Sequence, residues 1–341
     1  MRFQFDAHQP YQASAIDAVV DLFDGQPADA NQLVTSLRLL PAQPSLIDRC
    51  ELSGQGEFDI ATEVGAVGNN LVLDEDTILS NLRRVQDRNG LDITDELVDG
   101  LQFDIEMETG TGKTYTYIKT MYELHKHYGW TKFIVVVPSV AIREGVIKSL
   151  ETMADHFAEE YGERMHYVAD DSSRLTSIDQ FASDSKIHVM VINTQAFNAT
   201  GADARRISMH LEDFAWRRPI DVIAETRPIL IIDEPQSVLG ADRNNKTRLG
   251  LKQFTPLFSL LYSATHRKDD VYNQVYRLDA IDAFNKRLVK KIEVIGVEQV
   301  GTTGTTGYLY LDAIVLAKKK GEVPRARISF NATTQVGLRT S

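Results

Sequence analysis

The chain of 341 residues contains one cysteine, Cys50, so no disulfide can form within it. A single thiol fits a reducing compartment, and we expect a cytoplasmic protein. Long apolar runs are also missing, because the longest ones, such as "FIVVVP" and "PILII", are far too short to span a bilayer. The N-terminal "MRFQFDAHQPYQ" lacks the apolar core of a secretory signal, and the eight histidines have no cysteine partners at zinc-ligand spacing. With 43% hydrophobic and 25% charged residues, the composition is that of a globular protein with one large or two ordinary domains.

Charge is unevenly distributed along the chain. The formal net charge is −11, which argues at first against a nucleic-acid partner. Between residues 286 and 341, however, ten basic residues stand against four acidic ones, so this segment carries +6 and the remainder −17. An acidic body with a basic end is compatible with DNA contact made locally, and equally with a solvated charged tail.

Short apolar runs recur along the chain and indicate strands buried on both faces, since they do not alternate with polar residues. These runs are "FDIEM" at 103–107, "FIVVV" at 133–137, "IHVMVI" at 187–192, "PILII" at 228–232 and "SLLYS" at 259–263. Helical patterns lie between them, at 113–129 and 140–162. Strands that alternate with helices predict βαβ units and a mostly parallel sheet, with the loops after the strands on one ligand-binding edge.

Two segments depart from this pattern. Residues 26–100 are rich in turn residues apart from a capped amphipathic helix at 74–90, and we interpret them as an elaboration inserted before the first core strand. After about residue 286 the sequence suggests short strands joined by a Gly/Thr turn, "GTTGTTG" at 301–307. The main α/β region is therefore predicted to end near residue 285.

The stretch "EMETGTGKTYTY" follows a predicted strand and opens a predicted helix, the context that a phosphate-binding P-loop requires. Gly110 and Gly112 allow backbone N–H groups to turn toward phosphates, and the following helix adds the positive end of its dipole. Lys113 can reach the β- and γ-phosphates, and the Thr114 hydroxyl can ligate magnesium. Met107 replaces the first glycine of the usual pattern, and a glycine turn that enters a helix by chance is the alternative. The residues expected to contact the nucleotide are Thr109, Gly110, Thr111, Gly112, Lys113 and Thr114.

A second element, "ILIIDEPQS" at 229–237, is a predicted buried strand that ends in two adjacent carboxylates. Two acids at the end of an apolar strand are costly unless a cation or a reaction needs them. We expect Asp233 to hold magnesium and Glu234 to act as the general base that activates water. A turn closed by Pro235 accounts for the proline but not for the paired acids. Lys113, Asp233 and Glu234 are therefore the candidate catalytic residues.

Two weaker elements complete the set. "LLYSATHR" ends another predicted strand with Ser263 and Thr265, a pattern that many strand ends share. Near the N-terminus, "QPYQASAIDAVVDLF" places Gln12 where its amide could read adenine, with Tyr11 or Phe5 as a stacking face. Taken alone, Gln12 is equally well explained as a solvated helix residue.

The ordered set "YQxxAI", "TGTGKT", "VVVPSVAIREG", "VINTQAFN", "IIDEPQS" and "LYSATH" resembles the first RecA-like lobe of superfamily 2 helicases and translocases. The particular stretches "METGTGKTYTY", "FIVVVPSVAIREGV" and "DEPQS" are similar to the restriction (Res) subunit of type III restriction-modification enzymes, and the resemblance extends over most of the chain. Pro235 and Gln236 separate it from the DEAD and DEAH RNA helicases. The resemblance implies a three-layer α/β P-loop NTPase lobe at 1–285 that uses ATP and Mg²⁺. It implies that residues 286–341 are the truncated, β-rich start of the next module.

The resemblance also implies roles for matching residues. A hydroxyl, an amide and exposed backbone N–H groups suit sequence-independent phosphate contacts along duplex DNA. The residues implied at the DNA backbone are Pro138, Ser139, Arg143, Thr194 and Gln195. Those implied to couple the nucleotide site to the DNA groove are Gln236, Ser263 and Thr265. The implied partner is a modification methyltransferase (Mod) subunit, to which recognition of the DNA site belongs.

Other segments typical of the family are missing from the sequence. No "QxxGRxxR"-like segment with an arginine finger follows residue 265. Since such an arginine is worth ~10³–10⁵ in rate, we expect this chain to bind ATP but to hydrolyse it poorly alone. A nuclease motif is matched only loosely by Asp171, Asp184 and Lys186, which fit a surface loop better. The resemblance implies the N-terminal motor part of a restriction subunit. The alternatives are an RNA-directed helicase lobe, a catalytically idle docking fragment and, remotely, a small-molecule kinase.

Overall fold

The computed structural model describes residues 9–28, 66–169, 175–194, 218–240, 246–265, 271 and 273–289, and two strands at 309–315 and 325–330. Contacts divide the chain into two compact units, Met1–Lys290 and Lys291–Ser341. The predictions made for Phe5, Asp171, Gln195 and the Gly/Thr segment 301–307 lie outside the described residues.

The first unit is built on a parallel sheet. Its strands are β1 (Gln102–Met107), β2 (Lys132–Val137), β3 (His166–Ala169), β4 (His188–Asn193), β5 (Ile229–Asp233), β6 (Ser259–Ser263) and β7 (Asn273–Leu278). Their order across the sheet is β3-β4-β2-β5-β6-β1-β7, and all neighbouring strands run parallel. The predicted α/β class with a parallel sheet is confirmed.

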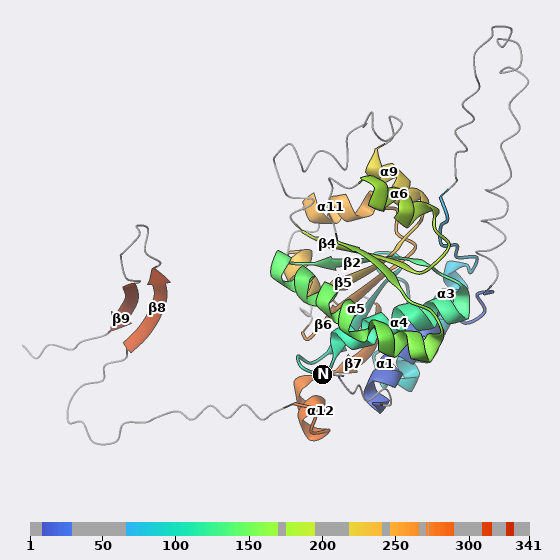
Figure 1. Ribbon diagram of the computed structural model, residues 1–341. Helices are drawn as coiled ribbons and strands as arrows, with labels where there is room; N and C mark the ends of the chain where they lie inside the picture. Colours follow the sequence, from blue (N-terminus) through green and yellow to red (C-terminus); the bar gives the residue numbers. More distant parts are fainter. Residues whose placement is uncertain are drawn as a thin grey trace, which may run out of the picture. The chain divides into compact units, whose positions relative to one another are not determined.

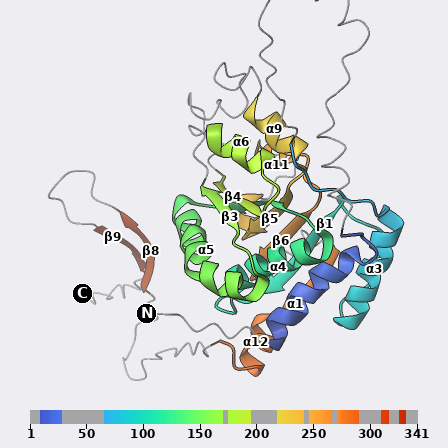
Figure 2. The same ribbon diagram turned by 45° about the vertical axis from the view of Figure 1, so that its right-hand side comes forward.

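Helices cover both faces of this sheet. They are α1 (Pro10–Val20), η1 (Asp21–Phe23), α3 (Glu75–Arg88), α4 (Lys113–Tyr128), α5 (Val140–Tyr161), α6 (Leu175–Ser183), α9 (Pro219–Glu225), α10 (Pro235–Val238), α11 (Lys246–Lys252) and α12 (Ala280–Asn285). In Figure 1, α1, α4 and α5 lie on one side of the strands and α6, α9 and α11 on the other, and Figure 2 shows the same three layers after a turn.

The central strands are apolar throughout because each of them serves two hydrophobic cores. In β2, Phe133, Val135 and Val137 pack into the core under α1, α4 and α5. Ile134 and Val136 point the other way, into the core under α6, α9 and α11. Successive side chains of a strand point to opposite faces, so burial on both sides requires a continuous apolar run.

Aromatic packing anchors the N-terminal helix to the sheet. The Phe23 ring stacks on Phe258 with centroids 4.3 Å apart and meets Trp130 edge-on at 5.0 Å. The Tyr128 hydroxyl donates to the carbonyl of Val20 at 2.8 Å, which joins the end of α4 to the end of α1. These contacts fix α1 beside α4, and they thereby determine where the side chains at the start of α1 lie.

The predicted helix at 74–90 is confirmed as α3. The Asp74 side chain accepts a hydrogen bond from the Thr77 amide at 2.8 Å, a normal N-cap contact. This helix contributes the buried side chains of Ile78, Leu82 and Val85 to the hydrophobic core.

The second unit contains the antiparallel strands β8 (Leu309–Val315) and β9 (Arg325–Phe330). They lie within the segment that the sequence predicts to be β-rich, most of which lies outside the described residues.

Candidate functional site

A tight turn with two glycines joins β1 to α4. Glu108 to Gly112 form it, and Thr111 closes the turn by donating both its amide, at 3.2 Å, and its hydroxyl, at 2.6 Å, to the Glu108 carbonyl. Gly110 and Gly112 have φ angles of 85° and 89°, which side chains with a Cβ rarely adopt. Lys113 and Thr114 then begin a helix of 16 residues. The free N–H groups of such a helix start and its dipole make an anion-binding cradle.

Tyr11 and Gln12 support this turn from α1. The Tyr11 hydroxyl and Gln12 Nε2 each donate to the Thr111 carbonyl at 3.0 Å. Gln12 also lies against Gly112, since a Cβ added to that glycine would come within 2.5 Å of Gln12 Nε2. Gln12 is buried, so the alternative of a solvated helix residue is wrong. Its role in reading adenine stays a prediction.

The two acids lie at the end of β5, on the same edge of the sheet as the turn. Asp233 ends the strand and is 8% exposed. The pKa of Asp233 is raised to about 6, first by burial and then by the neighbouring Glu234 carboxylate, against the opposing charge of Lys113. Glu234 has a φ of 55°, which for a residue other than glycine costs roughly 1–3 kcal/mol and typically marks a functional site. The backbone at Glu234 therefore carries strain beside a carboxylate that is reluctant to ionise.

A chain of polar contacts joins the three predicted motifs. Lys113 Nζ and Glu234 Oε1 form an ion pair at 2.8 Å. The other Glu234 oxygen accepts from Gln236 Nε2 at 2.5 Å, and the Gln236 oxygen accepts from the Ser263 hydroxyl at 2.9 Å. The Thr265 carbonyl, 2.7 Å from Ser263 Oγ, is an alternative acceptor for the same hydroxyl proton, and Ser263 Oγ accepts from the Thr265 amide at 3.1 Å. A displacement of Lys113 can therefore change the contacts of Ser263 at the end of β6.

Stability should depend on the protonation of Asp233. The folded chain keeps the proton up to about pH 6, whereas an ordinary Asp loses it near pH 4. Stability is therefore lost as the pH rises from about 4 to 6, and the loss persists above that range. We expect Asp233→Asn, which stays neutral, to be about 2–3 kcal/mol more stable than the unmodified chain at pH 7. Urea unfolding at pH 7 and pH 4 checks this. An equal difference at the two pH values would contradict it.

Several of the predicted DNA-contacting residues meet at the ends of β2 and β4. The Thr194 amide donates to the Val137 carbonyl and its hydroxyl to that of Pro138, both at 3.2 Å. Ser139 caps α5, because its Oγ accepts from the Ile142 amide at 3.3 Å. Arg143 lies one turn into α5 and pairs with Glu144 at 3.0 Å. The start of α5 and Thr194 lie on the same sheet edge as the turn between β1 and α4.

Sequence reasoning missed two features of the site. The first is the Tyr11 hydroxyl, which supports the turn. The second is Tyr117, which is fully buried on α4 and whose pKa is raised by this burial and further by the Asp233 carboxylate. The spacing of Tyr117, three residues after Thr114, was the signal that could have identified it, because such residues share a helix face.

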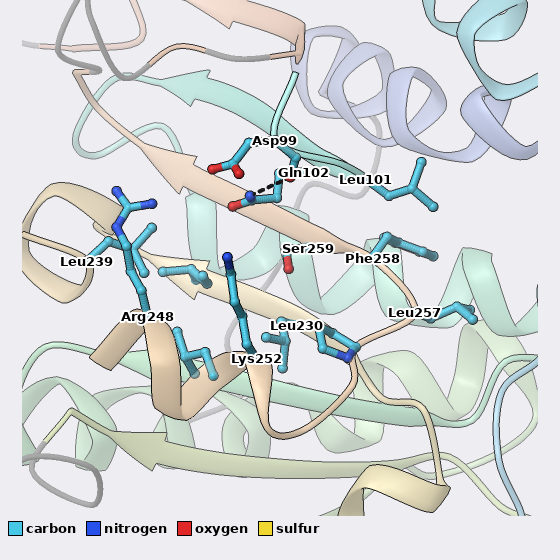
Figure 3. Close-up of a pocket in the computed structure, with 13 residues that line it drawn as sticks. Asp99, Leu101, Gln102, Leu230, Leu239, Arg248, Lys252, Leu257, Phe258 and Ser259 are labelled. Atoms are coloured by element: carbon cyan, nitrogen blue, oxygen red, sulfur yellow. Dashed lines mark hydrogen bonds between the residues drawn. The ribbon is translucent and has the colours of Figure 1, made fainter. Parts of the chain in front are cut away.

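A cavity of about 540 Å³ lies apart from these motifs (Figure 3). It is bounded by α11 and by Gln102 and Ser259, the first residues of β1 and β6, and Arg248 and Lys252 stand along it. None of the predicted site residues lines it.

Within the described ranges, no cluster of three or more His, Cys, Asp or Glu side chains suits a metal ion. Likewise, none of the described helices combines the length and apolar character needed to cross a membrane.

The motif residues fit a nucleotide carrying magnesium. The turn has two glycines in the left-handed conformation, and around Gly110 there is open space where a Cβ would stand. A lysine and a hydroxyl follow at the helix start, and a buried carboxylate stands at the end of a nearby strand. The Thr114 hydroxyl and the Asp233 carboxylate are oxygen ligands of the kind that proteins offer to Mg²⁺ when phosphates and water supply its other ligands.

A parallel sheet with a phosphate turn after β1 and an acidic pair after β5 defines a RecA-like P-loop NTPase. The chain belongs to the family "Type III restriction enzyme, res subunit", whose sequence model matches residues 7–268. Over 309 residues it is 30% identical to the type III restriction-modification enzyme EcoPI Res subunit of Escherichia phage P1. It is equally similar, over the same length, to the EcoP15I Res subunit of Escherichia coli.

These alignments cover 85% of this chain and 29% of each relative, so the chain spans less than a third of their length. Among solved structures, the SWI2/SNF2 ATPase core of Sulfolobus solfataricus in complex with dsDNA matches with 14% identity and a TM-score of 0.35. That match covers 57% of this chain and 32% of the other.

Proposed function

We propose that this chain is the ATP-binding and ATP-hydrolysing motor lobe of a type III Res subunit, and that hydrolysis is coupled to switching or movement on duplex DNA. The observation that carries the proposal is the run of contacts from Lys113 through Glu234 and Gln236 to Ser263. It links the residue that would bind phosphate to the residue that would activate water, and both to the strand end beyond them.

The ion pair between Lys113 and Glu234 connects the phosphate turn to the candidate base. The Lys113 ammonium lies 2.8 Å from Glu234 Oε1 and occupies that side of the carboxylate. Phosphates placed in the cradle compete for Lys113, and its transfer to them releases Glu234 to take a proton from water. The released carboxylate keeps its bond from Gln236, which holds its second oxygen. Nucleotide binding would thus free Glu234 to act as the base. Gln236 would move with Glu234, and its contact with Ser263 would change in the same step.

Other residues of the site position the nucleotide. The backbone of Thr109 to Gly112 would surround the phosphates, and Thr114 and Asp233 would hold the magnesium ion. Bound Mg-ATP supplies the phosphoanhydride bond that is cleaved and the cation that offsets charge on the phosphates. Gln12 would place the adenine end while it supports the turn. Slow ATP hydrolysis by this stretch of chain alone stays a prediction.

Duplex DNA would lie along the ends of β2 and β4. Pro138, Ser139, Thr194 and Gln195 would contact the phosphodiester backbone through hydroxyl, amide and main-chain groups, with Arg143 released from Glu144 to join them. A Mod subunit would supply site recognition, and cleavage would belong to another part of the Res subunit. The relatives support this assignment through their names as restriction-modification enzymes.

Reciprocal binding of DNA and nucleotide tests the coupling. If the two sites are linked, duplex DNA raises the affinity for Mg-ATP by the same factor by which a non-hydrolysable Mg-ATP analogue raises the affinity for DNA. Both affinity ratios can be measured with fluorescent ligands on the unmodified chain and on Ser263→Ala. In Ser263→Ala we expect both ratios to fall toward one. An effect of single-stranded RNA but not of duplex DNA would indicate another superfamily 2 helicase. Binding of neither nucleotide nor DNA would indicate an idle docking fragment.

A further inference from the structure

The cavity under α11 is a feature that the proposed motor function does not use (Figure 3). Its volume of about 540 Å³ lies within the range of roughly 300–1,000 Å³ that is usual for pockets that hold small molecules. It is bounded by the first residues of β1 and β6, whereas the phosphate turn follows the last residue of β1. Along β1 these two ends are roughly 17 Å apart, at about 3.3 Å per residue. A ligand held at the strand starts would therefore not occupy the phosphate turn.

Apolar side chains form much of the cavity wall. They come from the sheet, from α11 and from the loop that enters β6, and they include Leu230, Ile232, Leu239, Leu251, Leu257 and Phe258. Small-molecule sites are typically lined in this way, with a few polar groups that orient the ligand. The wall therefore suits a ligand with an apolar body.

The charged side chains at the cavity are mainly basic. Arg248 and Lys252 lie one turn apart on α11, so they share a face of that helix. In Figure 3 both extend from α11 toward the start of β1. Among the described residues that line the cavity, Asp99 is the one acid, which leaves a net charge of +1. Lys252 takes part in none of the ion pairs formed within the described part of the chain. The lining thus offers a cation to an anionic group.

Hydrogen bonds hold the rim of the cavity opposite α11 in place. Asn273 is fully buried on β7, and its Nδ2 group donates to the carbonyls of Gln102 at 2.7 Å and Val98 at 3.2 Å. Its Oδ1 accepts from the Val98 amide at 3.2 Å. The Ser259 amide donates to the Leu101 carbonyl at 2.9 Å, which joins the starts of β6 and β1. The cavity is therefore formed by the fold itself, and binding a ligand there does not require this rim to be built.

We propose that this cavity binds a small organic anion, with an apolar aromatic or branched aliphatic body and a single carboxylate, sulfonate or phosphate group. The apolar body lies against Leu230 and Ile232 of β5 and Leu251 of α11, where its burial drives binding. Lys252 and Arg248 hold the anionic group at the side of the cavity that α11 forms. The inference is independent of the proposed motor function, because none of the motif residues lines the cavity.

The test titrates the full chain with two fluorescent dyes that differ in charge. Anilinonaphthalene sulfonate (ANS) has an aromatic body with a sulfonate, and phenylnaphthylamine (NPN) is its uncharged counterpart. We expect saturable ANS binding that excess Mg-ATP does not displace. Lys252→Gln should weaken ANS binding by about two- to fivefold, the effect of losing an exposed ion pair, and leave NPN binding unchanged. Adding Arg248→Gln should weaken ANS binding further.

Two more variants serve as controls. Lys246→Gln removes a cation from the same helix that does not line the cavity, and it should change the binding of neither dye. Ser259→Leu puts a larger side chain into the cavity and should cause loss of both dyes. If Ser259→Leu melts at a lower temperature, the comparison of Lys252→Gln with Lys246→Gln decides alone. The inference would be overturned by equal ANS affinities in these two variants, by displacement of ANS by Mg-ATP, or by no ANS binding to the unmodified chain.

Discussion

Glu234→Gln is expected to lower ATP turnover by about 10²- to 10⁴-fold, the usual contribution of a general base, and at the same time to strengthen ATP binding. The second effect follows from the ion pair at 2.8 Å, which must break before Lys113 can reach phosphate. A partly exposed pair is worth roughly 0.2–1 kcal/mol, so affinity should rise up to about fivefold. Single-turnover hydrolysis and equilibrium titration of Mg-ATP measure the two effects separately.

The matched control for this variant is Glu225→Gln, which removes a carboxylate from the last turn of α9, away from the phosphate turn. It should change neither quantity. If Glu234→Gln weakened ATP binding as much as turnover, the carboxylate would be holding the nucleotide, and its assignment as a base released by Lys113 would be wrong.

Gly112→Ala is expected to lower ATP affinity by roughly five- to thirtyfold, equal to the ~1–2 kcal/mol cost of a left-handed backbone for alanine. The φ of Gly112 is 89°, so the alanine variant relaxes away from the cradle and binding has to restore it. The new Cβ would also stand 2.5 Å from Gln12 Nε2 and push that side chain off the Thr111 carbonyl. Calorimetric titration with Mg-ATP checks the affinity.

Gly110→Ala provides the comparison, because Gly110 has a similar φ of 85° but open space around it. It should cost only the backbone strain and so be milder than Gly112→Ala. In the double variant Gly112→Ala, Gln12→Ala nothing more should be lost through the turn, since that Gln12 contact is already gone, and any additional loss measures the adenine contact proposed for Gln12. Equal losses in Gly110→Ala and Gly112→Ala would show that Gln12 does not act through the turn.

The interior of the sheet could be predicted from the sequence, but its edges could not. β2, β4, β5 and β6 are buried on both faces, and their continuous apolar runs indicate this directly. The edge strands β3 and β7 could not be predicted, because they lack a continuous apolar run of this kind. β7, with the sequence "NQVYRL", mixes polar and apolar residues, and β3 is only four residues long, so neither has the pattern of a doubly covered strand.

Motif spacing placed the candidate residues at the strand ends where the structure has them, yet it could not predict how they contact one another. The ends of parallel strands meet at one edge, so the convergence of Lys113, Asp233 and Ser263 was foreseeable. The pairing of Lys113 with Glu234 rather than Asp233 depends on the left-handed backbone at Glu234, which no local propensity favours. The complete burial of Tyr117 against Tyr262 likewise depends on how α4 packs against β6, a tertiary arrangement that the sequence does not reveal locally.

The central claim is that the turn after β1 binds Mg-ATP through Lys113. Calorimetric titration of Mg-ATP into the unmodified chain, Lys113→Ala and Lys126→Ala tests it most directly. Lys126 is the control because it lies on the same helix with 60% of its side chain exposed. We predict binding in the micromolar range that survives in Lys126→Ala. Lys113→Ala should weaken it at least tenfold, as expected for a lost hydrogen bond to a charged group worth ~1.5–3 kcal/mol. Equal affinities for all three folded proteins, or no binding by the unmodified chain, would contradict the claim.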